Sequence, residues 1–222
     1  MICQHTFTAI DFESAGTSVG GTDTPVQVAT ATWSPDPCNQ VDVYDSKPSL
    51  TLPSDTWMSY IHTDKKITWA AQQVHGITSD KLKDAPKLIL LWPDLKRRLA
   101  NKVVVAHGHG TEKRFLRVFP NHGFKPWVDT LHLTRAAYPT LDSYSLGDVC
   151  NEIKLTNEVD EIAQIASPEN TISWHDALYD SIASIVLLRH IINTFSLTHS
   201  PLSLLTQPNT SAWRQNNTDS QL

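Results

Sequence analysis

The chain has 222 residues, of which 40% are hydrophobic and 18% are charged, and its formal net charge is −5. This length and composition are typical of one globular domain with a sizeable core. The negative balance excludes a positive field over the whole surface, but it is compatible with a local basic groove beside a set of acids. The apolar runs are far too short to span a bilayer, so no membrane association is expected.

The three cysteines, Cys3, Cys38 and Cys150, are far apart and odd in number, and no CxxC pair occurs. This pattern indicates neither a disulfide framework nor a zinc site, and it favours reduced thiols in a cytoplasmic protein. The N-terminus has no basic region followed by a long apolar segment, so no signal peptide is expected.

The first predicted strand, residues 6–13, carries two carboxylates inside an apolar run, with Asp11 and Glu13 on either side of Phe12. Side chains alternate across a strand, so both carboxylates project from one face. Two acids side by side on a core strand repel each other and resist desolvation. A divalent cation would relieve both costs, so the pair predicts a metal site if other parts of the chain supply further ligands.

The remaining elements follow from hydrophobic periodicity and turn signals. Five strands are predicted, at residues 6–13, 26–33, 41–44, 103–106 and 127–128. Helices are predicted near residues 82–100, 111–119, 145–153 and 175–195, with Asp129 as the cap of another helix. Three strands followed by alternating helices and strands predict an α/β fold with a central mixed five-stranded sheet and helices on both faces.

The C-terminal segment, residues 197–222, is rich in Ser, Thr, Asn and Gln, and we expect a loosely ordered tail after a single domain over residues 1–196. Within the tail, Leu202, Leu204 and Leu205 are apolar enough to dock locally. No internal repeat and no second domain is evident.

A third acid, Glu112, follows the strand at 103–106 through a Gly-rich turn. An acid in the first turn of a helix is favoured by the helix dipole alone, so Glu112 has a purely structural interpretation. The functional interpretation delivers Glu112 from the end of a core strand towards Asp11 and Glu13. His107 and His109 lack the further ligands that a tetrahedral zinc site needs.

A fourth acid, Asp180, lies beside a face of small residues on the helix near 175–195. A buried carboxylate there costs several kcal/mol unless it meets a cation or hydrogen-bond donors. His175 precedes Asp180 by five residues, which is about 140° on a helix, so the two share a site only if His175 lies on the loop or in the first turn. Otherwise His175 is a helix-start histidine bonded to the backbone.

Four carboxylates and a histidine at the ends of core elements fit two-metal phosphodiester hydrolysis. Hard ions such as Mg²⁺ and Mn²⁺ prefer carboxylate oxygens, and a pair of them stabilises the attacking and leaving oxygens. A neutral histidine can take the proton from the attacking water.

These residues resemble the DEDDh 3′→5′ exonucleases of the ribonuclease H-like fold over roughly residues 5–195. Asp11-Phe12-Glu13 is similar to the first motif of that family, residues 107–116 to the second and residues 175–180 to the third. Two softer stretches also fit, His75-Gly76-Ile77-Thr78 and Asp129-Thr130-Leu131.

The resemblance implies that Asp11, Glu13, Glu112 and Asp180 bind two Mg²⁺ or Mn²⁺ ions and that His175 is the general base. It implies a nucleic-acid substrate, DNA or RNA, with a free 3′ end. The candidate substrate-binding residues are Phe12, Ser14, Ala15, Gly16, His107, Lys113 and Arg114. For Lys113 and Arg114, which would contact phosphates, a solvated helix face is the alternative.

The second motif departs from the family pattern, because Gly108 stands where Asn is usual and Glu112 where Asp is usual. Glu reaches about 1–1.5 Å further than Asp, roughly one bond length. A catalytically weakened nucleic-acid-binding or partner-binding module of the same fold is therefore the alternative function. Dimerisation and association with a polymerase are left open.

Overall fold

The computed structural model describes residues 1–17, 22–35, 53–209 and Trp213. In this part of the chain, five strands form one sheet in the order β3-β2-β1-β4-β5. They are β1 (Phe7–Ser14), β2 (Pro25–Trp33), β3 (Asp55–Tyr60), β4 (Val103–Ala106) and β5 (Trp127–Asp129). β1 pairs antiparallel with β2 and parallel with β4, so the sheet is mixed and the predicted fold class is confirmed.

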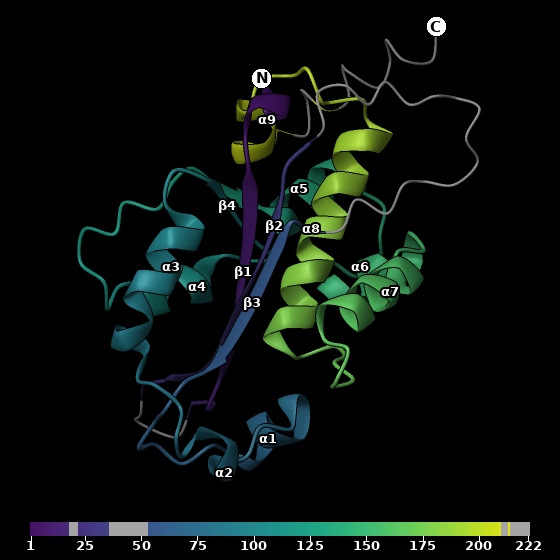
Figure 1. The fold of residues 1–222 in the computed structure, drawn as a ribbon. Helices are drawn as coiled ribbons and strands as arrows, with labels where there is room; N and C mark the ends of the chain where they lie inside the picture. Colours follow the sequence, from purple (N-terminus) through teal and green to yellow (C-terminus); the bar gives the residue numbers. More distant parts are fainter. Residues whose placement is uncertain (18–21, 36–52, 210–212, 214–222) are drawn as a thin grey trace, which may run out of the picture.

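Helices cover both faces of the sheet (Figure 1). One face packs against α8 (Ala177–Thr194), α5 (Thr130–Ala137), α6 (Leu146–Glu152) and α7 (Thr156–Ala166). The other face packs against η2 (Leu88–Leu91), α3 (Trp92–Leu99) and α4 (Gly110–Leu116). Among the described residues, no helix combines the length and the apolarity needed to cross a bilayer.

The alternation of β1 explains both layers. Phe7 and Ala9 are buried in the core on the α8 side, whereas Ile10 and Phe12 are buried in the core on the α3 and α4 side. Asp11 and Glu13 have the parity of Phe7 and Ala9, so they face the α8 side near the end of the strand.

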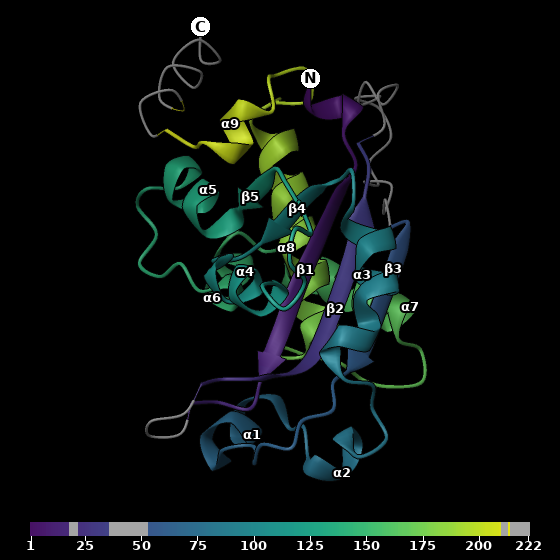
Figure 2. The same cartoon turned by 90° about the vertical axis from the view of Figure 1, so that its left-hand side faces the viewer.

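Two short helices, α1 (Trp69–His75) and α2 (Ser79–Leu82), lie beyond the end of the sheet at which β1 terminates (Figure 2). At the opposite end, η1 (Ile2–Gln4) and α9 (Ser203–Thr206) lie together, because the backbone amides of Ile2 and Cys3 donate to carbonyls of Ser200 and Thr198. This second end lies far from Asp11 and Glu13 along β1.

Several predicted elements differ from the observed ones. The strand predicted at 41–44 lies outside the described residues, and the strand beside β2 is β3, which the sequence analysis missed. The helix predicted over 82–100 was too long, since α3 begins only at Trp92 after the 3₁₀ turn η2. The helix α7 was not predicted, although Val159, Ile162 and Ala163 form its buried stripe.

The C-terminal segment contains packed residues. Leu205 in α9 is fully buried, and Trp213 is buried against the ring of Phe195. Residues 197–209 were expected to belong to a loosely ordered tail in which Leu202, Leu204 and Leu205 could dock locally. Leu197 and Leu205 lie in the core on the α8 side. The apolar side chains within the polar sequence account for this docking.

Candidate active site

The strand β1 carries the first two acids to the edge of the site. Asp11 pairs in register with Ala29 of β2, and Glu13 pairs with Gln27. Both acids are only partly covered, and the register shifts between Glu13 and Ser14, where the strand ends. The two carboxylates therefore lie on the face that α8 covers, at the end of the sheet nearest α1.

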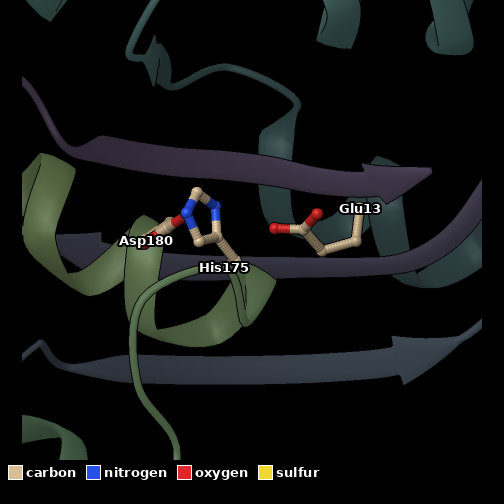
Figure 3. A group of neighbouring side chains, drawn as sticks. All are labelled: Glu13, His175 and Asp180. Atoms are coloured by element: carbon tan, nitrogen blue, oxygen red, sulfur yellow. The ribbon is translucent and has the colours of Figure 1, made fainter. Parts of the chain in front are cut away.

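The helix α8 brings Asp180 and His175 to the same place. Asp176 caps this helix, its Oδ1 accepting a hydrogen bond from the amide of Leu178 at 2.9 Å. His175 lies on the loop directly before the cap with φ of 66°, and its side chain is exposed. Glu13, His175 and Asp180 each offer an atom within 4.8 Å of the other two (Figure 3). The condition for His175 and Asp180 to share a site is thus met.

The remaining acid, Glu112, lies in the first turn of α4. Its side chain is 4% exposed, and its Oε2 has no hydrogen-bond partner in the described part of the chain. Asp180 Oδ1 is likewise buried without a partner there. Buried carboxylate oxygens without donors are costly, so each needs an explanation.

The electrostatics of the four acids indicate one coupled cluster. Burial raises the pKa of Glu13 to about 9, helped by repulsion from Asp11 and Asp180. Burial and repulsion from Asp11 raise the pKa of Asp180 to about 8. The pKa of Asp11 is raised well above its ordinary value by burial and by Glu112, and burial with repulsion from Asp129 raises the pKa of Glu112 to about 7.

The cluster fits a divalent cation. Within the described residues, none of the four acids forms an ion pair with Lys or Arg. The donor set consists of carboxylate oxygens, which hard ions such as Mg²⁺ and Mn²⁺ prefer. A bound cation gives the buried oxygens a partner and lowers the raised pKa values, because it neutralises the repulsion among the carboxylates that burial strengthens.

The loop after β1 is held against α1. His75 Nδ1 accepts from the amide of Ile77 at 3.0 Å, so Nε2 carries the proton and donates to the carbonyl of Ser14 at 3.0 Å. Gly16 has φ of +79°, and a Cβ at this position would lie 2.4 Å from Thr68 Oγ1. A side chain at Gly16 is therefore excluded, and α1 closes one side of the site next to the backbone of residues 14–16.

Two of the predicted substrate-binding side chains are engaged elsewhere. Phe12 is 6% exposed and packs edge-on against Phe115, with ring centroids 5.4 Å apart, on the face opposite the acids. His107 donates from Nε2 to the carbonyl of Tyr144 at 2.8 Å, and its Nδ1 lies 3.0 Å from Thr130 Oγ1. Neither ring nitrogen of His107 is left free for a substrate.

The predicted basic residues Lys113 and Arg114 follow Glu112 on α4 and contact residues outside the acid cluster. Lys113 donates to His109 Nε2 at 2.8 Å and lies over the ring of Trp127. Arg114 pairs with Asp23 at 3.2 Å and lines a cavity of about 530 Å³ together with Phe115. Because Phe115 packs on Phe12, this cavity belongs to the α4 side of the sheet, away from Asp11 and Glu13.

Two further residues shape the site, Gln27 and Asp176, and neither was predicted from the sequence. Gln27 Nε2 donates to Asp176 Oδ2 at 3.0 Å, and Gln27 Oε1 accepts from the amide of Ala177 at 3.0 Å. The signal in the sequence was a polar side chain inside the apolar run Val26-Gln27-Val28.

The family model of the RNase T type, described as "Exonuclease", matches residues 8–188. The chain belongs to this exonuclease family. The match begins in β1 and ends within α8, so it includes every element that carries the four acids and His175.

Solved exonucleases share the fold. The structure of Exonuclease X in complex with 5′ overhanging duplex DNA has a TM-score of 0.61 and 22% identity, covering 90% of this chain and 97% of that chain. The nuclease domain of 3′hExo, a DEDDh family member bound to rAMP, has a TM-score of 0.58 and 14% identity, covering 85% and 92%. At these identities the likeness concerns the fold.

Curated relatives are much longer proteins. The PolC-type DNA polymerase III of Bacillus subtilis is 25% identical over 140 residues, which are 60% of this chain and 9% of that protein. The 3′-5′ exonuclease DinG of Staphylococcus haemolyticus is 33% identical over 111 residues, which are 47% of this chain and 12% of that protein. The similarity is therefore confined to a small part of each relative.

Proposed function

We propose that this chain is a metal-dependent 3′→5′ exonuclease that hydrolyses the terminal phosphodiester bond of DNA or RNA and releases nucleoside monophosphates. The observation that carries the proposal is the cluster of four coupled carboxylates, two of whose buried oxygens have no partner among the described residues, beside the exposed His175. Membership of the exonuclease family supports the reaction class.

Each residue of the cluster has a role in this proposal. Asp11, Glu13, Glu112 and Asp180 would hold two Mg²⁺ or Mn²⁺ ions, which supply charge neutralisation at the attacking and leaving oxygens. His175 accepts the proton of the attacking water, and its ring is exposed and lies beside Glu13 (Figure 3). In this proposal the backbone of residues 14–16 lies beside the terminal nucleotide. Lys113 and Arg114 attract phosphates further along the nucleic-acid strand.

The test uses an oligonucleotide labelled at its 5′ end. With Mg²⁺ or Mn²⁺ the protein should shorten it stepwise, and EDTA should stop the reaction. Separate DNA and RNA substrates establish the sugar preference. Binding of the oligonucleotide without product under any divalent ion would instead favour the alternative, a nucleic-acid-binding module of the same fold.

Replacing His175 with alanine should lower kcat by about 10²–10⁴-fold, the usual worth of a positioned general base. Metal-induced thermal stabilisation should persist, because the four acids remain. Added imidazole should restore part of the activity, and the exposed His199→Ala variant should behave like the wild type. Loss of metal stabilisation in His175→Ala would make this residue a ligand and would contradict its role as base.

Replacing Glu112 with glutamine should reduce the number of Mn²⁺ ions bound per chain from two to one in calorimetric titrations. A neutral amide is a poor ligand for a hard cation, so activity should fall by about 100-fold. Glu161→Gln, an exposed substitution on α7, controls for the loss of one negative charge. Two ions bound to Glu112→Gln would show that Glu112 has only its structural role in the first turn of α4.

Association with a polymerase is a further expectation, supported by the PolC-type DNA polymerases among the relatives. Dimerisation and the cytoplasmic location stay predictions from the sequence. Light scattering of the purified chain, alone and with a single-stranded oligonucleotide, measures the oligomeric state directly.

A further inference from the structure

The buried side chain of Gln27 connects the two elements that carry the candidate ligands. Gln27 is 0% exposed and lies on β2, directly opposite Glu13 in the register of the antiparallel pair. Its amide reaches across the interface with α8 and bonds two consecutive residues at the start of that helix, Asp176 and Ala177. Both polar atoms of a side chain with no access to water thereby have a hydrogen-bond partner.

The chemistry of the partners determines how this amide is oriented. The amide of Ala177 can only donate, so it requires Oε1 of Gln27. The carboxylate of Asp176 accepts, so it requires the Nε2 donor. Because the other oxygen of Asp176 caps the helix at Leu178, Gln27 bonds to the cap and to the first free amide of α8 together.

A second side chain makes the same connection one turn later. The hydroxyl of Ser181, which is fully buried, donates to the carbonyl of Ala29 on β2 at 3.2 Å. Asp180 lies between these two attachments, and its amide donates to the carbonyl of Asp176 at 3.0 Å. The position of Asp180 relative to Glu13 therefore depends on how the first turn of α8 is held against β2.

We propose that Gln27 is a positioning residue that sets the first turn of α8 against β1 and β2, so that Asp180 and His175 meet Glu13. Gln27 offers no contact to a metal or substrate in this role. It acts through Asp176 and Ala177, and the complementary pair Gln27–Asp176 fixes the direction of the hydrogen bond. The expected effect on hydrolysis rests on the proposed function and the expected effect on Mn²⁺ affinity on the proposed metal site, but the expected effect on helix mobility rests on neither.

An exchange of the two chemical groups tests this directly. Gln27→Glu places a carboxylate against the carboxylate of Asp176, and Asp176→Asn places two amide donors against each other. In the double variant, the new amide at position 176 donates to the new carboxylate at position 27 and still caps Leu178. That carboxylate still accepts from Ala177, so both bonds of the wild type return, one of them in the reverse sense. Gln164→Glu, the same change at an exposed position of α7, is the matched control.

Three measurements apply to all variants: kcat with a labelled oligonucleotide, Mn²⁺ affinity by calorimetry, and hydrogen exchange of a peptide spanning residues 174–182. Each single change should lower kcat about tenfold or more and should speed exchange. Each should also shift Mn²⁺ affinity, because Gln27→Glu adds a carboxylate opposite Glu13 and Asp176→Asn removes one that repels Glu13 and Asp180. The double variant should recover all three to within about threefold of the wild type, since residues in contact are not additive.

Single variants with wild-type values, or a double variant no better than the worse single one, would overturn the proposal. If Gln27→Glu does not fold, Asp176→Asn retains a good helix cap and allows the same comparison with the double variant. If the wild type lacks nuclease activity, the proposed function fails while exchange and Mn²⁺ affinity still decide the role of Gln27. If Mn²⁺ also does not bind, exchange alone decides it.

Discussion

Replacing Asp11 with asparagine is expected to abolish hydrolysis and, at the same time, to stabilise the metal-free protein. Asp11 repels Asp180 and Glu13 and is itself repelled by Glu112, so it lies at the centre of the coupled cluster. Losing a central ligand should cost several kcal/mol of transition-state stabilisation, or about 1000-fold in rate. Removing one repelling charge should raise the melting temperature without metal, by about 2–4 °C for each kcal/mol regained.

The substitution should lower the rate of hydrolysis and raise the melting temperature of the metal-free protein. Stepwise shortening of a labelled oligonucleotide measures the rate, and thermal unfolding in EDTA measures the stability. Asp142→Asn, an exposed substitution, should change neither. A substantial residual rate in Asp11→Asn, or a lower melting temperature in EDTA, would mean that the carboxylate of Asp11 is not part of a repelling metal cluster.

The metal-free protein should lose stability as the pH rises from about 5 to 9, and Mg²⁺ or Mn²⁺ should reverse this loss. In the unfolded chain these carboxyl groups titrate near pH 4. In the folded protein the pKa of Glu13 is about 9 and that of Asp180 about 8. Between these limits the folded state binds more protons than the unfolded state, so the free energy of unfolding falls with increasing pH.

Metal binding has the opposite pH dependence, because ions compete with protons for the same oxygens. At a metal concentration of about 100 times Kd the stabilisation is about 2.7 kcal/mol, which corresponds to roughly 5–10 °C in a chain of this size. Thermal unfolding at pH 6 and pH 9, each with EDTA or Mn²⁺, measures both effects. A melting temperature that rises towards pH 9 in EDTA would contradict the raised pKa values, and equal curves with and without Mn²⁺ would contradict the metal site.

The part of the site that follows simple periodicity could be predicted from the sequence. Asp11 and Glu13 share a face because they are two residues apart on a strand. Asp180 stands out because a carboxylate beside small apolar residues needs a partner. Four of the five strands of the described sheet were predictable from their apolar runs, such as the three consecutive valines of Val103–Ala106, whereas β3 was not.

The rest depends on tertiary contacts. The resemblance predicted that Phe12 lies near the substrate, because it occupies the matching position of the motif. A matching position does not specify the direction of a side chain. In β1 the side chains alternate, and that of Phe12 lies in the core on the α3 and α4 side. Gln27 and Asp176 are 149 residues apart, so nothing local indicates their bond. The partners of the two ring nitrogens of His107, Thr130 and the carbonyl of Tyr144, likewise lie far away in the sequence.

The candidate ligands come from both extremes of the family match, with Asp11 and Glu13 on its first strand and Asp180 on its last helix. During synthesis, a ribosome-bound chain that has not yet exposed α8 has no Asp180 and no His175 to complete the cluster. Every such incomplete chain would therefore lack residues that the proposed hydrolysis needs. The cluster would be complete only after α8 docks against β1 and β2.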